Sequence, residues 1–183
     1  MSFQKLSMED LNRLSVEAFR ETPKHDFVFV LDNIRSLNNV GSIFRTADAF
    51  RAEKIYLCGH TGTPPHRDIT KTALGADESV AWEYHSDTAN LIAQLNTEGY
   101  VTVAVEQAKE SKFLNDFQPK MGQKYAFILG NEVFGVSDEV LQQCNFCLEI
   151  PQFGTKHSLN VSVSAGIVAW DFVSKKMLQQ ITS

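Results

Sequence analysis

The stretch "FVFVLDNIRSLNNVGSIFRTADAF", residues 27–50, decides the fold. It opens with a continuous apolar run of strand length, residues 27–33. After the polar turn "IRSLNN", apolar side chains recur at the spacing of one helical face, and these are Val40, Ile43, Phe44, Ala47 and Phe50. A nearly solid apolar strand followed by an amphipathic helix is typical of a parallel sheet, because helical crossovers bury both faces of such a sheet.

The same alternation of strands and helices continues through the rest of the chain. Further strands are predicted at residues 54–59, 79–85, 100–107, 124–130 and 146–151, and helices at residues 68–76, 88–96, 138–144 and about 160–181. A short helix is predicted over residues 7–21, where Ser7 and Asp10 are placed as a capping pair. The pattern predicts an α/β fold, with a mostly parallel sheet and helices on both faces.

Length and composition limit the class of protein. With 183 residues and 43% hydrophobic content, the chain is long enough for one globular domain without disulfides or metal. The N-terminus lacks the apolar core of a signal peptide, and no segment approaches the roughly 18 apolar residues of a membrane span. We therefore expect a cytoplasmic protein that enters no membrane. The net charge of −5 argues against holding nucleic acid by bulk electrostatics, but it does not exclude a local basic patch.

The sequence offers no set of residues with the spacing of a metal site. Cys144 and Cys147 form a CxxC pair, but zinc needs two more ligands nearby. Cys58 is remote, and the five histidines never pair at i, i+4 or as HxH. We therefore expect reduced, buried cysteines and no bound metal.

Polar clusters follow three of the predicted strands: "DNIRSLNN" at 32–39, "GNEVFG" at 130–135 and "QFGTKHS" at 152–158. Ligands of parallel sheets bind beyond the carboxyl ends of the strands, so the three clusters could share one crevice. The sequence contains no GxGxxG after the first strand, no GxxxxGK followed by Ser or Thr, and no GxSxG. These absences weaken the dinucleotide, P-loop nucleotide and serine-hydrolase interpretations.

The clusters belong to three longer segments that follow one another along the chain: "NNVGSIFRTADAF" (38–50), "FILGNEVFGVS" (127–137) and "IPQFGTKHSLNVSVSAGI" (150–167). Together they resemble the three motifs of the SpoU-type, SPOUT-class (TrmH-like) RNA ribose 2′-O-methyltransferases, over about residues 27–172. The resemblance implies a doubly wound sheet with a C-terminal trefoil knot, a homodimer, and S-adenosylmethionine bound in the knot. It also implies a methyltransferase domain over residues 25–183, preceded by a helical extension over residues 1–24.

The resemblance also assigns roles to matching positions. The implied catalytic set is Arg45, Asn39, Glu132, Ser158 and Asn160. The implied cofactor-binding set is Leu129, Gly130, Ile150, Gly154, Ser158 and Leu159. RNA contacts are expected from Arg45, Asn33, Arg67, Lys71 and Lys156, and no metal is needed.

The chemistry of these side chains agrees with the implied roles. A sulfonium is already an activated methyl donor, so the main task of the protein is to align the ribose oxygen with the methyl carbon. Arg45 keeps its proton, so we assign it to a phosphate beside the target ribose, and the hydroxyl proton then leaves to that phosphate or to water. Each side chain also has a simpler interpretation. Asn39 could only cap a helix, and Arg45 could be an ordinary surface residue. Glu132 could be a solvated carboxylate, whereas the resemblance implies that it holds Asn39 or Arg45.

The sequence therefore favours an enzyme that methylates ribose 2′-oxygens in RNA, with tRNA preferred over rRNA. Guanosine 18 and the anticodon wobble nucleotide are the candidate positions in tRNA. The alternatives are an rRNA 2′-O-methyltransferase and a non-catalytic RNA-binding module of the same fold. An α/β protein for a small phosphorylated metabolite is a further alternative, which gains little support without a phosphate-loop sequence.

Overall fold

A seven-stranded sheet forms the centre of the computed structural model, which describes residues 3–7 and 10–182. The strand order is β3-β2-β1-β6-β4-β7-β5, and every neighbouring pair is parallel. The mostly parallel sheet predicted from the sequence is confirmed. The strands are β1 (His25–Asp32), β2 (Ala52–Cys58), β3 (Trp82–His85), β4 (Val101–Val105), β5 (Lys112–Phe113), β6 (Tyr125–Leu129) and β7 (Phe146–Glu149).

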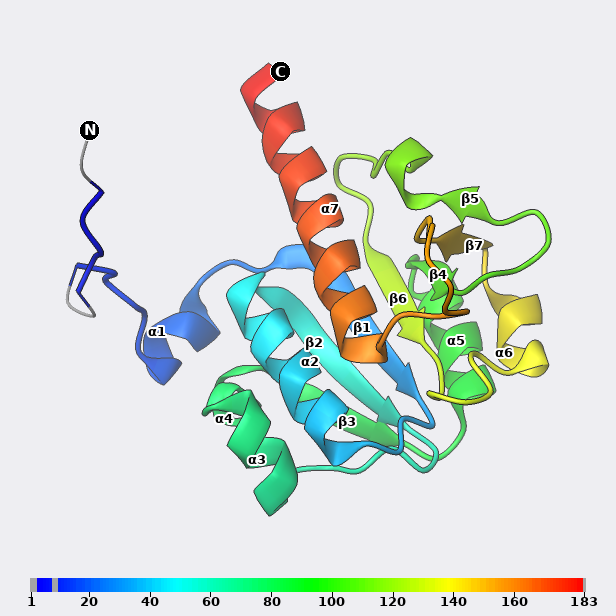
Figure 1. The fold of residues 1–183 in the computed structure, drawn as a ribbon, viewed down its shortest axis with the longest axis horizontal. Coiled ribbons are helices and arrows are strands. Elements are labelled where there is room, and N and C mark those ends of the chain that lie inside the picture. Colours follow the sequence, from blue (N-terminus) through cyan, green and yellow to red (C-terminus); the bar gives the residue numbers. More distant parts are fainter. Residues whose placement is uncertain (1–2, 8–9, 183) are drawn as a thin grey trace.

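Helices cover both faces of the sheet, as predicted (Figure 1). One face carries α2 (Leu37–Ala49), α3 (Arg67–Ala73), α4 (Ala76–Ser79) and the long α7 (Val161–Thr182). The other face carries α5 (Thr88–Thr97) and α6 (Asp138–Gln143). The short α1 (Val16–Glu21) precedes the sheet, and a 3-10 turn, η1 (Leu114–Asp116), follows β5.

Strand β1 shows why the apolar run had to be unbroken. Phe27 and Phe29 belong to the core beneath α2 and α7, whereas Val28 and Val30 belong to the core beneath α5 and α6. Successive side chains of a strand point to opposite faces, so a strand covered on both sides needs apolar residues throughout. The ring centroids of Phe27 and Phe172 lie 5.2 Å apart, which anchors α7 on the sheet.

The predicted N-terminal helix is wrong over most of its length. Ser7 and Asp10 do exchange hydrogen bonds, with the Asp10 amide donating to Ser7 Oγ at 3.1 Å, but they close a turn, and residues 8 and 9 lie outside the described residues. The helix begins only at Val16, after a left-handed Asn12 (φ 44°). Leu11 and Leu14 stay exposed, so no burial drives a longer helix.

Other boundaries also differ from the prediction, and the strand expected at 79–85 begins only at Trp82, because Ser79 ends α4. Helix α2 begins at Leu37, inside the expected turn, because the Ser36 hydroxyl caps it by accepting from the Asn39 amide at 3.3 Å. The helix expected at 68–76 is divided into α3 and α4 by left-handed Leu74 (φ 52°) and Gly75 (φ 90°). Strand β5 was not predicted because it has only two residues.

Two features implied by the family resemblance stay predictions: the trefoil knot and the division of the chain after residue 24. Among the described helices, none combines the length and apolar character needed to cross a membrane.

Candidate active site

Glu132 joins the second motif to the first. Its Oε1 accepts from the Ser36 amide at 3.0 Å and from Asn39 Nδ2 at 3.0 Å, and its Oε2 accepts from the Arg35 amide at 3.1 Å. The carboxylate therefore sits at the N-terminus of α2, where the helix dipole favours negative charge. Of the two partners considered from the sequence, Glu132 holds Asn39.

Asn39 in turn joins the first motif to the third. Asn160 Nδ2 donates to Asn39 Oδ1 at 3.2 Å, while Asn160 Oδ1 accepts from the Ser162 amide at 2.9 Å. Asn160 is thus the cap of α7, whereas the cap of α2 is Ser36 and not Asn39. A continuous chain of side-chain hydrogen bonds, Glu132 to Asn39 to Asn160, brings the three motifs together at one edge of the sheet.

The same contacts shift the titration of Glu132. Burial acts to raise the pKa of this carboxyl, but hydrogen bonds from the Arg35 amide, the Asn39 side chain and the Ser36 amide outweigh it. The net result is a pKa below the ordinary value of 4.5. A lowered pKa stabilises the folded state above the ordinary value, and that stabilisation is lost as the pH falls through the lowered pKa.

We expect Glu132→Gln to destabilise the fold by about 1 kcal/mol at neutral pH, because an amide nitrogen would face a backbone donor. The difference from the wild type should begin to shrink as the pH falls below the ordinary value of 4.5 and should continue to shrink as the pH falls through the lowered pKa of Glu132. Urea unfolding of the variant and the wild type at several pH values measures this difference in the free energy of unfolding. Glu139→Gln, which makes the same chemical change at an exposed carboxylate in the first turn of α6, is the control. A Glu132→Gln penalty that is unchanged at pH 3 would contradict the assignment.

A cavity of about 730 Å³ opens beyond the carboxyl ends of β4, β6 and β7. Its walls contain most of the expected cofactor residues, namely Leu129, Gly130, Ile150, Ser158 and Leu159, together with Glu132 and Asn160. Gly154 is not in the wall, and a Cβ built on it meets no heavy atom within 4 Å. The structure therefore brings five of these six positions to one cavity.

Gly130 is required by a close backbone approach at the rim of this cavity. A Cβ at this position would lie 2.1 Å from the carbonyl carbon of Gly135 and 2.1 Å from the amide nitrogen of Val136. The loop returns on itself through an Asn131–Gly135 bridge, in which the Asn131 amide donates to the Gly135 oxygen at 3.0 Å. Only glycine leaves room for this return.

The sequence interpretation missed Glu106 and Gln107, which follow β4 and lie in the same cavity wall. Glu106 Oε2 accepts from the Val136 amide at 3.1 Å, and Gln107 Nε2 donates to the His157 carbonyl at 2.7 Å. The end of β4 thereby fastens both loops that close the cavity. The available signal is a polar pair after an apolar strand, as in the three motifs, but the strand predicted at 100–107 includes both residues.

Arg45 lies away from the cavity of its own chain. It follows Asn39 by six residues on α2, which turns it roughly 120° around the helix and about 9 Å along it. It lines a separate groove of about 500 Å³ between α2 and α3, together with Lys71. The side chain of Arg45 makes no hydrogen bond or ion pair with any residue that the structure describes.

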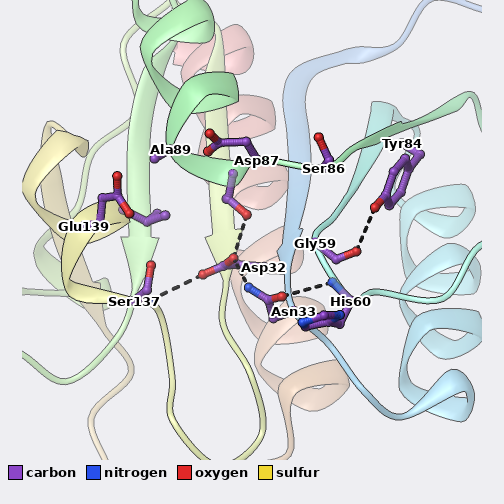
Figure 2. A pocket seen from close by; sticks show the side chains of 12 residues that line it. Asp32, Asn33, Gly59, His60, Tyr84, Ser86, Asp87, Ala89, Ser137 and Glu139 are labelled. Carbon is purple, nitrogen blue, oxygen red and sulfur yellow. Dashed lines mark hydrogen bonds between the residues drawn. The ribbon is translucent and has the colours of Figure 1, made fainter.

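Asn33 borders a third cavity, of about 440 Å³, at the ends of β1 and β2 (Figure 2). Its backbone is left-handed (φ 57°), and its Oδ1 accepts from the His60 amide at 3.0 Å. Its Nδ2 donates to Asp32 Oδ1 at 2.9 Å, an oxygen that also accepts from Thr88 Oγ1 at 2.7 Å. Both polar atoms of the Asn33 side chain are therefore engaged in holding the ends of these strands.

The remaining predicted RNA contacts are dispersed. Arg67 is the exposed first residue of α3, and Lys156 lies in the exposed loop 153–160. Of the five predicted positions, only Arg45 and Lys71 share a groove. The role of each as an RNA contact stays a prediction.

The cysteines are three free thiols, with Cys58 buried and Cys144 and Cys147 half-buried. Burial raises the pKa of Cys58 and of Cys144 to about 12, which suits the inert structural role predicted for them. Over residues 3–7 and 10–182, no group of three or more His, Cys, Asp or Glu side chains is arranged to hold a metal ion.

The parallel sheet and the cavity beyond its strands define an α/β protein of the kind that binds ligands at the carboxyl edge of the sheet. Residues 26–170 match the model of the SpoU rRNA Methylase family, and the chain belongs to this family.

Relatives with different RNA substrates in their names are almost equally similar. The mouse tRNA (guanosine(18)-2′-O)-methyltransferase TARBP1 is 29% identical over 153 residues, which cover 82% of this chain and 10% of that protein. The 23S rRNA (guanosine-2′-O-)-methyltransferase RlmB of Neisseria meningitidis is 28% identical over 152 residues, covering 83% of this chain and 60% of that protein.

Among solved structures, the AdoMet-bound rRNA methyltransferase from Sinorhizobium meliloti superposes with a TM-score of 0.75 at 26% identity. The match covers 84% of this chain and 58% of that one. The chain thus spans 60% or less of each of these three proteins.

Proposed function

We propose that the protein is an S-adenosylmethionine-dependent methyltransferase that modifies a ribose 2′-oxygen in RNA, with tRNA as the substrate class. The observation that carries the proposal is the hydrogen-bond chain Glu132–Asn39–Asn160, which joins all three motifs beside the cavity. Family membership and the activities for which the mouse and Neisseria relatives are named support it. Guanosine 18, named in the mouse relative, and the wobble nucleotide are the candidate positions.

The cavity suits S-adenosylmethionine in size and lining. Its volume of about 730 Å³ lies within the range of about 300–1,000 Å³ typical of small-molecule sites. Leu129, Ile150 and Leu159 offer apolar surface for an adenine ring, and Ser158 and Glu106 offer hydrogen-bonding groups for the polar parts. When bound, the cofactor supplies an activated methyl group.

The side chains of the protein then position the RNA. Ser158 and Asn160 belong to the reacting end of the cavity, and Asn160 is oriented by Asn39. Arg45 holds a phosphate beside the target ribose through paired N–H donors. Because a guanidinium does not accept a proton, the proton of the 2′-hydroxyl leaves to that phosphate or to water.

A homodimer is part of the proposal. Helix α7 exposes a stripe of apolar side chains at seven-residue spacing, continued at its end: Val163, Trp170, Met177 and Ile181. Trp170 lies beside Phe50, with ring centroids 6.2 Å apart, and Phe50 lines the groove that contains Arg45. A second copy seated on this stripe would therefore lie next to Arg45, so dimerisation offers a route by which Arg45 reaches an active site.

Trp170→Glu is expected to convert a dimer into a monomer, because it places a charge in the middle of the apolar stripe. Sedimentation velocity measures the change, with the wild type at twice the mass of one chain. Phe113→Glu, which alters an exposed aromatic residue (47% exposed) on β5, is the matched control and should leave the dimer intact. A monomeric wild type at micromolar concentration would overturn the homodimer.

The substrate class is tested by transfer of labelled methyl groups from S-adenosylmethionine to unmodified tRNA and rRNA, supplied separately. We expect label in the tRNA. Label in rRNA alone would select the rRNA alternative. No transfer to either RNA, together with no cofactor binding by calorimetry, would favour the non-catalytic RNA-binding module. Cofactor binding without transfer would point to a different RNA substrate or a missing partner.

A further inference from the structure

A carboxylate that belongs to none of the three motifs lies in the cavity wall. Glu106 is the first residue after β4 and is only partly buried. Its Oε1 accepts from the Gln107 amide at 2.8 Å, and its Oε2 accepts from the Val136 amide at 3.1 Å. Both donors are backbone groups, and no ion pair with Glu106 occurs among the described residues.

The hydrogen-bonding capacity of Glu106 is half used. A carboxylate offers about four acceptor sites, so about two remain toward the cavity. Glu132, in the same wall, differs because its two oxygens already receive three donors from residues 35–39, around the start of α2. Glu106 is therefore better placed than Glu132 to accept hydrogen bonds from a ligand.

The surrounding backbone is shaped around this side chain. Gly135 has a left-handed backbone (φ 69°), and a Cβ there would lie 2.1 Å from Glu106 Oε2. The loop that closes the cavity thus reaches the Glu106 carboxylate as closely as a glycine permits. The Val136 amide of this loop and the neighbouring Gln107 amide each occupy one oxygen of Glu106, and these two contacts leave about two acceptor sites unexplained.

Position in the sheet indicates what the spare acceptors bind. In the dinucleotide-binding members of the doubly wound class, an acidic side chain near the carboxyl ends of the strands accepts a hydrogen bond from a ribose hydroxyl of the cofactor, and ligands of such sheets in general lie across these strand ends. Glu106 follows β4 and faces the cavity in the same way. We infer that Glu106 accepts hydrogen bonds from the ribose hydroxyls of the bound cofactor, an inference that rests on the proposed function.

The test measures binding of S-adenosylhomocysteine and of its 2′-deoxy and 3′-deoxy counterparts by calorimetry, without RNA. In the wild type, removing the recognised hydroxyl should weaken binding about tenfold. Glu106→Gln keeps one acceptor for the Val136 amide, places an NH2 group opposite the Gln107 amide, and should weaken binding of S-adenosylhomocysteine to a similar degree. The deoxy compound should then bind the variant as well as S-adenosylhomocysteine does, because both changes remove the same contact.

Asp138→Asn is the matched control, since it changes another carboxylate of the cavity wall that has no assigned role. This variant should retain the tenfold preference for the hydroxylated compound. Methylthioadenosine, which keeps the ribose but lacks the amino acid, should show the same loss in Glu106→Gln. A loss that disappears with methylthioadenosine would mean that Glu106 binds the amino acid part, which overturns the inference.

The remaining outcomes separate this inference from the proposed function. Glu106→Gln and removal of the hydroxyl could instead weaken binding independently, so that the two fold-losses multiply. Glu106 would then act only on the loop, and the inference would fail while the proposed function stands. If S-adenosylhomocysteine does not bind the wild type even at millimolar concentration, the proposed function fails and takes the inference with it.

Discussion

Arg45→Ala is expected to lower the rate of methyl transfer to RNA by about a hundredfold or more, with cofactor affinity unchanged. The two effects separate because Arg45 lines the groove between α2 and α3 and not the cavity beyond β4, β6 and β7. Its guanidinium is free of partners within the described chain, so removing it disturbs no internal contact. Single-turnover rates at saturating RNA measure the first effect, and calorimetry measures the second.

Two further variants sharpen this prediction. Arg45→Lys keeps the charge but loses the paired donors, so an intermediate rate is expected if the guanidinium holds a phosphate. Lys71→Ala alters the other cation of the same groove and should weaken RNA binding more than it lowers the saturated rate. Full activity of Arg45→Ala would refute the role assigned to Arg45.

Gly130→Ala is expected to weaken binding of S-adenosylhomocysteine at least tenfold. The added Cβ would lie 2.1 Å from the backbone of residues 135 and 136, so this loop has to move away from β6. The movement breaks the Asn131–Gly135 bridge and the hydrogen bond from the Val136 amide to Glu106. Overpacking of this kind costs about 1–3 kcal/mol, which corresponds to about a ten- to hundredfold loss if it falls on the closed loop.

The matched variant is Gly154→Ala, the same chemical change at the other glycine that the family resemblance assigned to the cofactor. Its Cβ meets nothing within 4 Å, so the affinity should change far less, within about threefold. Calorimetry measures the affinity of both variants for S-adenosylhomocysteine, and thermal unfolding compares their stability. Unchanged affinity in a folded Gly130→Ala would contradict the placement of the cofactor beneath this loop.

The parts of the fold that were predictable are those where local pattern and burial agree. Residues 27–31 form a buried strand because both faces of the sheet are covered, and the sequence there is apolar without interruption. The helix expected over residues 7–21 failed for the opposite reason, since Leu11 and Leu14 find no core to enter. Its capping pair formed all the same, which shows that a local hydrogen-bond pattern does not by itself create a helix.

The residues of the candidate site that could be predicted are those that lie in one of the three motifs. The contact between Glu132 and Asn39 spans 93 positions and was expected only because both motifs resembled those of one family. The direction of Arg45 could have been deduced from its position six residues after Asn39 on the same helix. This spacing places the two side chains on different faces of the helix. Glu106 was missed because it lies outside every motif, and its proximity to Val136 follows only from the parallel pairing of β4 with β6.

The most direct test of the proposed reaction is the chemical position of a transferred methyl group. RNA labelled by the protein with methyl-labelled S-adenosylmethionine is digested completely in alkali, which cleaves beside every free 2′-hydroxyl. A 2′-O-methyl group removes the attacking hydroxyl, so the proposed reaction predicts label in alkali-resistant dinucleotides. Label found only in mononucleotides would mean methylation of a base, and it would contradict the central claim.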